Sequence, residues 1–227
     1  MIEIFVWILL TLLVASISAV IAKKHGPEYI IGLYASMVVI ANVLANKIVT
    51  FLWWEIDAGT IVYSTIFLLT DMLSEFYGKK TAKKAVWTGF FANVMLGASV
   101  WIAINWQPAA SWGNQAAFAA TLGNTYRIII ASMIAYLISQ HHDVWAYNFW
   151  KKVTKGKHLW LRNNASTAVS QLLDSVIFVT IAFYGVFPIF DMIIGLYIVK
   201  LIIASVDTPY LYAVKWYYGK KKPIKNE

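Results

Sequence analysis

Polar side chains interrupt a long apolar stretch, LWLRNNASTAVSQLLDSVIFVTIAF, at residues 159–183. Asn163, Thr167, Gln171 and Asp174 follow one another at intervals of four, four and three residues, so they share one face of a helix. A carboxylate, two amides and a hydroxyl on one face can donate hydrogen bonds to a polar guest and accept them from it. The spacing therefore predicts a line of polar contacts on the side of this helix that faces a cavity.

Several other apolar stretches carry polar residues at the same mid-depth level. An ionisable side chain costs roughly 2.5–3.5 kcal/mol at the centre of a membrane helix, so these residues must face the interior of a bundle. We predict that a polar cavity is lined by Asp174, Lys200, Asn42, Gln171, Asn93 and Asn46. Two alternatives stay open: the amides can join helices without touching a ligand, and Asp174 and Lys200 can form a structural ion pair.

Further charged residues lie nearer the ends of the apolar stretches. We predict supporting or coupling roles for Asp71, Glu75, Asp143, Asp207, Arg127 and Lys47. The carboxylates could carry protons or form structural pairs. Asp71 and Glu75 could pair locally with the lysines at 79 and 80, and Arg127 is expected to extend toward the outer interface.

The composition indicates an all-α polytopic membrane protein, a single transmembrane domain over residues 1–227. The chain is 60% hydrophobic and 13% charged, whereas soluble domains contain about 25% charged residues. Its 11 Trp and 13 Tyr suit two interfacial belts. The absence of cysteine excludes disulfide and thiolate chemistry. No metal is expected, because the adjacent His141 and His142 point to different sides of a helix.

The apolar stretches predict seven transmembrane helices. We place them near 4–22, 30–53, 59–77, 85–106, 123–148, 160–185 and 191–214. With seven crossings, sixteen of the 19 basic residues fall on one side, and the opposite loops at 54–59, 107–123 and 184–191 contain none. Basic loops mark the cytoplasmic side. We therefore predict a cell (inner) membrane protein with its N-terminus outside and its C-terminus in the cytoplasm, and no direct contact with nucleic acid.

Three segments together resemble a known family. They are VIANVLANKIV (39–49), IFLLTDMLSEFYGKKTAKKAVWTGF (66–90), and RIIIASMIAYLISQHHDVWAYNFWKK (127–152) running on to LWLRNNASTAVSQLLDSVIF (159–178). They look like the queuosine precursor transporter family, also called the vitamin uptake transporter family, over about residues 32–212. The resemblance implies a six-helix core similar to the substrate-binding subunits of energy-coupling-factor transporters, with an additional first helix.

The resemblance also implies import of a small deazaguanine base, in its cyano or aminomethyl form, with no enzymatic activity and no cofactor. It maps onto Asn42, Lys47, Asp71, Glu75, Arg127, Asp143, Ser166, Asp174 and Lys200. The residue types agree with such a ligand, because a carboxylate such as Asp174 can accept from the ring N–H and the exocyclic amine. Lys200 or Asn42 can donate to the ring carbonyl.

Other functions stay open from the sequence. The chain could be a substrate-binding subunit that works with an ATP-driven module docked at Ala41 and Ala45, or it could import another vitamin-like or nucleobase solute. A homodimer is also open. A seven-helix photoreceptor with a Schiff base on Lys200 and an intramembrane enzyme are disfavoured, the latter because no HExxH or nucleophile motif occurs.

Overall fold

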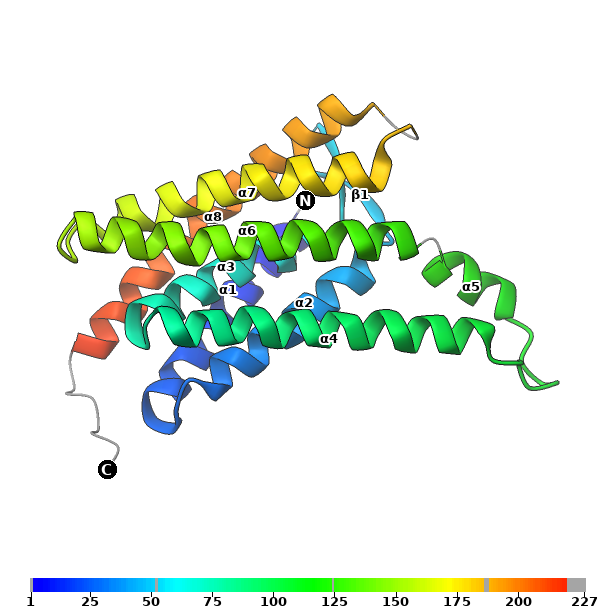
Figure 1. Ribbon diagram of the computed structural model, residues 1–227, viewed down its shortest axis with the longest axis horizontal. Coiled ribbons are helices and arrows are strands. Elements are labelled where there is room, and N and C mark those ends of the chain that lie inside the picture. The colour runs from blue at the N-terminus through cyan, green and yellow to red at the C-terminus, as the bar shows by residue number, and fades with distance from the viewer. Residues whose placement is uncertain (1, 52, 124, 186–187, 220–227) are drawn as a thin grey trace.

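The computed structural model describes residues 2–51, 53–123, 125–185 and 188–219, most of which are helical (Figure 1). The helices are α1 (Ile2–His25), α2 (Glu28–Leu44), α3 (Gly59–Phe76), α4 (Lys79–Asn105), α5 (Gln115–Gly123), α6 (Thr125–Val153), α7 (Leu159–Phe183) and α8 (Ile189–Gly219). Two strands, β1 (Ile48–Phe51) and β2 (Trp54–Asp57), form an antiparallel hairpin between α2 and α3.

Helix α3 lies in the centre of the bundle and packs against α1, α2, α4, α6 and α8. Fifteen of its 18 residues are buried. The outer helices instead expose large apolar side chains, such as Phe5, Leu9 and Leu13 on α1. Exposed apolar surface on this scale suits a lipid environment.

Five segments of the described chain are long and apolar enough to cross a membrane. They are Ile2–His25, Lys79–Asn105, Gln115–Val153, Leu159–Phe183 and Ile189–Gly219. Helix α2 is a shorter apolar helix, and α3 does not meet the same test. Because neighbouring helices surround α3, it can carry polar residues without exposing them to lipid.

The expected second span at 30–53 differs from the structure beyond Leu44. Helix α2 ends there, and the hairpin pairs Ile48 with Asp57 and Phe51 with Trp54. β-Branched residues dominate IVTF and favour a strand, and a short apolar run does not by itself distinguish a strand from a helix. The all-α prediction therefore misses a hairpin that reaches into the bundle.

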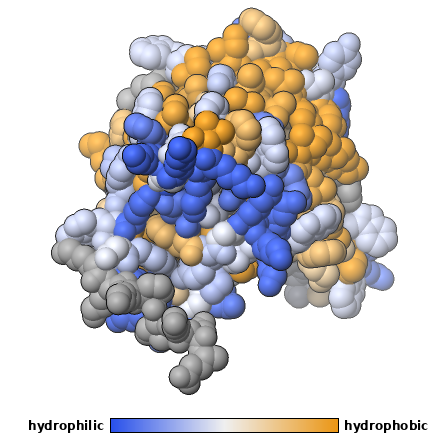
Figure 2. Space-filling view, turned by 60° about the vertical axis from the view of Figure 1, so that its left-hand side comes forward, coloured by the Kyte–Doolittle hydropathy of each residue, from blue (hydrophilic) through white to orange (hydrophobic). Residues whose placement is uncertain are grey.

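The two ends of the bundle have different characters (Figure 1). The connections α1–α2, α3–α4 and α6–α7 lie at one end together with the end of α8, whereas the hairpin and α5 lie at the other. Figure 2 shows hydrophilic side chains gathered on the first end, beside a hydrophobic flank. This end carries the predicted cytoplasmic lysines, and we call it the basic end.

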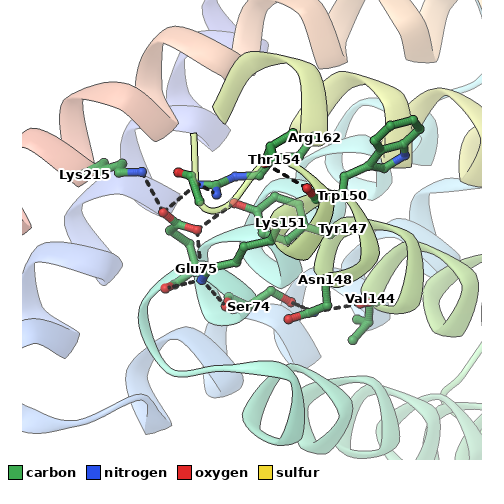
Figure 3. Close-up of polar contacts among 11 residues, drawn as sticks. Ser74, Glu75, Val144, Tyr147, Asn148, Trp150, Lys151, Thr154, Arg162 and Lys215 are labelled. Carbon is green, nitrogen blue, oxygen red and sulfur yellow. Dashed lines mark hydrogen bonds and ion pairs between the residues drawn. The ribbon is translucent and has the colours of Figure 1, made fainter. Parts of the chain in front are cut away.

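Glu75 joins four helices at the basic end (Figure 3). Its carboxylate pairs with Lys151 Nζ of α6 at 3.0 Å, Arg162 Nη2 of α7 at 2.6 Å and Lys215 Nζ of α8 at 2.8 Å. The Tyr147 hydroxyl also donates to it at 3.2 Å. The expected local pairing with the lysines at 79 and 80 is therefore wrong for Glu75, whose ion pairs come from distant helices.

The packing of α4 against α2 and α6 requires a glycine at position 89. A Cβ atom there would lie 2.6 Å from the Tyr136 hydroxyl and 2.8 Å from Tyr34. Neither ring can move freely, because the two hydroxyls hydrogen-bond to each other at 3.0 Å and Tyr136 also donates to Val86 O at 2.6 Å. About two turns further along the same helix, a Cβ atom at Gly97 would meet only Ile129, at 3.6 Å.

We therefore expect Gly89→Ala to lower the stability of the purified protein, whereas Gly97→Ala should leave it unchanged or raise it. Overpacking of a core costs about 1–3 kcal/mol, and alanine stabilises an unobstructed helix by up to about 1 kcal/mol relative to glycine. Thermal unfolding in detergent measures both variants. Equal unfolding temperatures for the two would contradict the packing described at Gly89.

Candidate functional site

A polar pocket lies inside the half of the bundle that contains the hairpin. Helices α2, α3, α6, α7 and α8 line it together with the end of β2. Its polar lining residues are Asn42, Asp57, Thr60, Tyr63, Ser132, Asp174 and Lys200, and Phe178, Leu196 and small side chains complete the wall. Most of these residues come from helices far apart in the sequence, so only the packed bundle assembles the pocket.

An ion pair between Asp174 and Lys200 forms the centre of the site. Lys200 Nζ donates to Asp174 Oδ2 at 2.6 Å, and both side chains are almost fully buried. The other carboxylate oxygen accepts from the Tyr63 hydroxyl at 2.6 Å and from Ser139 Oγ at 3.1 Å. An ammonium has three N–H donors, and within the described residues Lys200 uses one of them, so it retains hydrogen-bonding capacity at the pocket.

The hairpin supplies a second carboxylate to the pocket. Asp57 ends β2 and accepts a 2.7 Å hydrogen bond from the Thr60 hydroxyl in the first turn of α3. Strand β2 packs on α8, where a Cβ atom at Gly195 would lie 2.8 Å from Trp54. Burial raises the pKa of the Asp57 carboxyl, while the Thr60 hydrogen bond and the nearby Lys200 charge act in the opposite direction.

Asn42 contributes an amide from α2. Its Nδ2 donates to Val38 O of the preceding turn at 2.9 Å, and its side chain is buried at the pocket wall. No partner for its Oδ1 is found among the described residues, which leaves that oxygen as an acceptor for a ligand. The pocket thus presents two carboxylates, an ammonium, an amide and two aromatic rings within one enclosure.

The pocket is narrow in this conformation. The volume open to water is ≈ 30 Å³, enough for about two water molecules. A flat bicyclic base is much larger than this, so the walls must separate before such a ligand enters.

The structure divides the predicted cavity residues into two groups. Asp174, Lys200 and Asn42 meet at the pocket, whereas Gln171, Asn93 and Asn46 do not line it. Gln171 and Asn93 are buried, and neither amide has a hydrogen-bond partner in the described part of the chain. Asn46 lies in the turn after α2 and donates to Val43 O at 3.1 Å.

The predicted supporting residues lie in different parts of the bundle, and none of them lines the pocket. Lys47 is exposed in the turn before β1, so it lies beyond the end of α2 and not on the predicted helical span. Arg127 donates from Nε to Ile181 O at 2.6 Å and from Nη2 to Tyr184 O at 2.8 Å, and thus caps the end of α7. The remaining ones, Asp71, Asp143, Asp207 and Ser166, are buried between the pocket and the Glu75 network.

Sequence reasoning missed several residues of the site. Asp57 and Thr60 lay in a stretch interpreted as an outer loop and a helix start, although Asp, Thr and Tyr at 57, 60 and 63 recur at the spacing of one helix face. Arg162, one of the sixteen basic residues that the seven-span prediction places on the cytoplasmic side, is fully buried against Glu75. The burial of an arginine depends on its partner, which the local sequence does not reveal.

Comparisons with known proteins find the same family that the three motifs resemble. Residues 57–214 match the family described as "Putative vitamin uptake transporter". A "Probable queuosine precursor transporter" of Bacillus subtilis is 36% identical over 181 residues, which are 78% of this chain and 79% of the relative. The "Queuosine precursor transporter" of Escherichia coli is 24% identical over 71% of each chain.

A "Probable queuosine precursor transporter" of Haemophilus influenzae is 25% identical over 56% of this chain and 51% of the relative. No solved structure matches the chain significantly. The family match covers more than half of the chain, and the Bacillus relative is matched over most of its length. The chain therefore belongs to the vitamin uptake transporter family, whose relatives are named queuosine precursor transporters, and it is a multi-pass membrane protein.

Proposed function

We propose that the protein imports 7-cyano-7-deazaguanine or 7-aminomethyl-7-deazaguanine and binds the base in the pocket around Asp174 and Lys200. The observation that carries the proposal is this buried carboxylate–ammonium pair beside the Asn42 amide, enclosed by helices of a membrane protein. The names of the relatives support the choice of a queuosine precursor. An ionisable pair at this depth is expensive to keep and is retained where it serves a ligand or an ion.

The chemistry of a deazaguanine fits the side chains of the pocket. One edge of the base presents a ring N–H and an exocyclic amine, and a carboxylate such as Asp174 or Asp57 can accept from both. The ring carbonyl accepts from Lys200. Tyr63 and Phe178 offer aromatic surfaces for stacking on the flat ring.

Import requires that the pocket open first to one side and then to the other. The hairpin covers its outer end, where Trp54 rests on Gly195. On the cytoplasmic side the Glu75 network joins α3, α6, α7 and α8. We propose that these two contacts separate in turn, and that the narrow pocket belongs to a conformation closed at both ends.

An ATP-driven partner module is the main alternative to independent transport. The small-residue pattern at Ala41 and Ala45 was its expected docking surface, but both residues line the internal pocket. The pattern therefore supports the packing of α2 around the site. Reconstitution of the purified protein alone decides between the two, because a subunit that depends on a module would not accumulate substrate.

Proteoliposome uptake of labelled 7-cyano-7-deazaguanine tests the proposed function. We expect transport by the wild type and a roughly 10- to 150-fold weaker affinity for Asp174→Asn, since a hydrogen bond to a charged group contributes about 1.5–3 kcal/mol. The matched control is Asp191→Asn, because Asp191 is an exposed carboxylate on α8. No uptake or binding of any deazaguanine by the wild type would overturn the proposal.

Removal of one member of a buried ion pair can also unfold a protein, so Tyr63→Phe provides a milder test of the same site. This change removes the hydroxyl that donates to Asp174 Oδ1 and keeps the ring. We expect several-fold weaker binding with little change in the unfolding temperature. Wild-type affinity in both variants would exclude the assignment of the pocket.

We also propose that the basic end faces the cytoplasm, as the positive-inside rule predicts. The chain has no cysteine, so single cysteines can be labelled without background. In intact cells, an impermeant maleimide should label Ser111→Cys, in the loop before α5, and should not label Lys157→Cys, at the basic end. Both positions are exposed. The reverse pattern would show the opposite orientation.

A further inference from the structure

Three carboxylates lie together between the pocket and the Glu75 network. Asp71 of α3, Asp143 of α6 and Asp207 of α8 are each at most 1% exposed. All ion pairs found in the described residues involve Glu75 or Asp174, so none of these three has a cationic partner. A buried carboxylate without a counter-charge is strongly destabilised unless it is protonated.

The contacts of Asp71 indicate how its charge is removed. Neither of its oxygens receives a hydrogen bond from any donor in the described part of the chain. The residue before it, Thr70, donates to Asp143 Oδ2 at 3.3 Å, so the packing of α3 on α6 brings the two carboxylates near each other. Two carboxyl groups can hydrogen-bond to each other only if one of them carries a proton. A proton on one of the two groups would supply the donor that the Asp71 oxygens lack.

The surroundings of the pair provide a second, independent sign of a binding site. Thr70 Oγ1 lies 3.3 Å from Asp143 Oδ2 and 3.5 Å from Gln140 Oε1, while the Nε2 of that glutamine has no partner among the described residues. On the other side, Asn163 Nδ2 donates to Asp207 Oδ1 at 3.2 Å, and its Oδ1 lacks a donor. Both amides are fully buried, and each is hydrogen-bonded to a residue of the cluster or to its neighbour Thr70, so each brings an unused donor or acceptor to the carboxyl groups.

A row of polar side chains on α7 lies between this cluster and the pocket. Gln171 lies one turn below Asp174 on α7, is fully buried, and has no partner for either amide atom within the described chain. Ser170 and Ser166 lie one and two turns below Asp174 on the same helix and are fully buried, and their hydroxyls donate to Ser166 O at 2.8 Å and to Asn163 O at 3.2 Å. Water or a hydroxonium proton can be relayed along such a row of amides and hydroxyls.

The other titratable groups near the cluster are already engaged. Glu75, one turn below Asp71, is compensated by Lys151, Arg162 and Lys215. His142 bonds to Ser170 at 2.9 Å, and Tyr147 donates to Glu75. No group of three or more potential metal ligands occurs in the described residues, so a metal ion is not the expected occupant.

We propose that Asp71 and Asp143, with Asp207 beside them, form a proton-binding site that couples proton entry to import. The inference rests on the proposed function for its coupling to substrate, but not for the proton itself. A proton arrives from the outer side along Gln171 and Ser170 and is held between the two carboxyl groups. It leaves to cytoplasmic water when the Glu75 network opens.

Uptake of labelled 7-cyano-7-deazaguanine under an inward proton gradient tests the coupling. With one proton per substrate, a gradient of one pH unit supports up to about tenfold accumulation. We expect this for the wild type, together with substrate-dependent acidification of the liposome interior. Asp71→Asn and Asp143→Asn should retain substrate exchange between equal pools but accumulate nothing above equilibrium. Glu55→Gln and Asp191→Asn, which change exposed carboxylates, should behave as the wild type.

Accumulation by the wild type that ignores the proton gradient, or that follows a sodium gradient instead, would overturn the coupling. So would gradient-driven accumulation retained by Asp71→Asn combined with Asp143→Asn. Infrared spectroscopy tests the proton without any substrate. The wild type at neutral pH should show the carbonyl band of a buried protonated carboxyl group, and the band should disappear or shift in each Asn variant.

The infrared measurement separates this inference from the proposed function. If the wild type neither binds nor exchanges any deazaguanine, the proposed function fails, and the protonated band still decides whether the carboxyl pair holds a proton. If uptake occurs but the band is absent from the wild type, the proton site is wrong and the substrate assignment stands. The wild-type spectrum alone can overturn the proton site, because an absent band excludes a protonated carboxyl pair even if the Asn variants fail to fold.

Discussion

A charged side chain within a membrane bundle must find its partner inside the protein, because lipid cannot solvate it. Helix α3 meets this constraint at three levels. Asp57, just before it, accepts from Thr60 in its first turn, Thr70 beside Asp71 donates to Asp143, and Glu75 is paired with three cations at the far end. The central helix therefore carries the polar groups, and the outer helices shield them from lipid.

The levels along α3 also divide the molecule by task. The hairpin and pocket lie at one end, the carboxyl cluster in the middle, and the Glu75 network at the other end. Each level draws its partners from α6, α7 and α8, so movement of one of these helices changes more than one level. A solute and an ion that bind at neighbouring levels can thus influence each other through the same helices, which is the physical basis of coupling.

Helical spacing predicted a buried polar stripe on α7, of which only Asp174 lines the pocket. The stripe of Asn163, Gln171 and Asp174 is buried along its whole length, and the structure brings Asp174 next to Lys200, as their common depth indicated. The hairpin was not foreseen, because apolar residues with β-branched side chains continue directly from the end of α2. Asp57 was missed with it, since its place in the pocket depends on how β2 folds back.

Composition, the spacing of polar residues and the distribution of lysines determine from the sequence alone that this chain is a helical membrane protein with a polar interior. These properties depend on neighbouring residues or on sums over the chain, so they can be inferred without the tertiary structure. The partner of each buried charge is decided only in the tertiary structure. Glu75 pairs with Arg162, 87 positions further along the chain. A pattern within a short stretch of sequence cannot reveal such a pair.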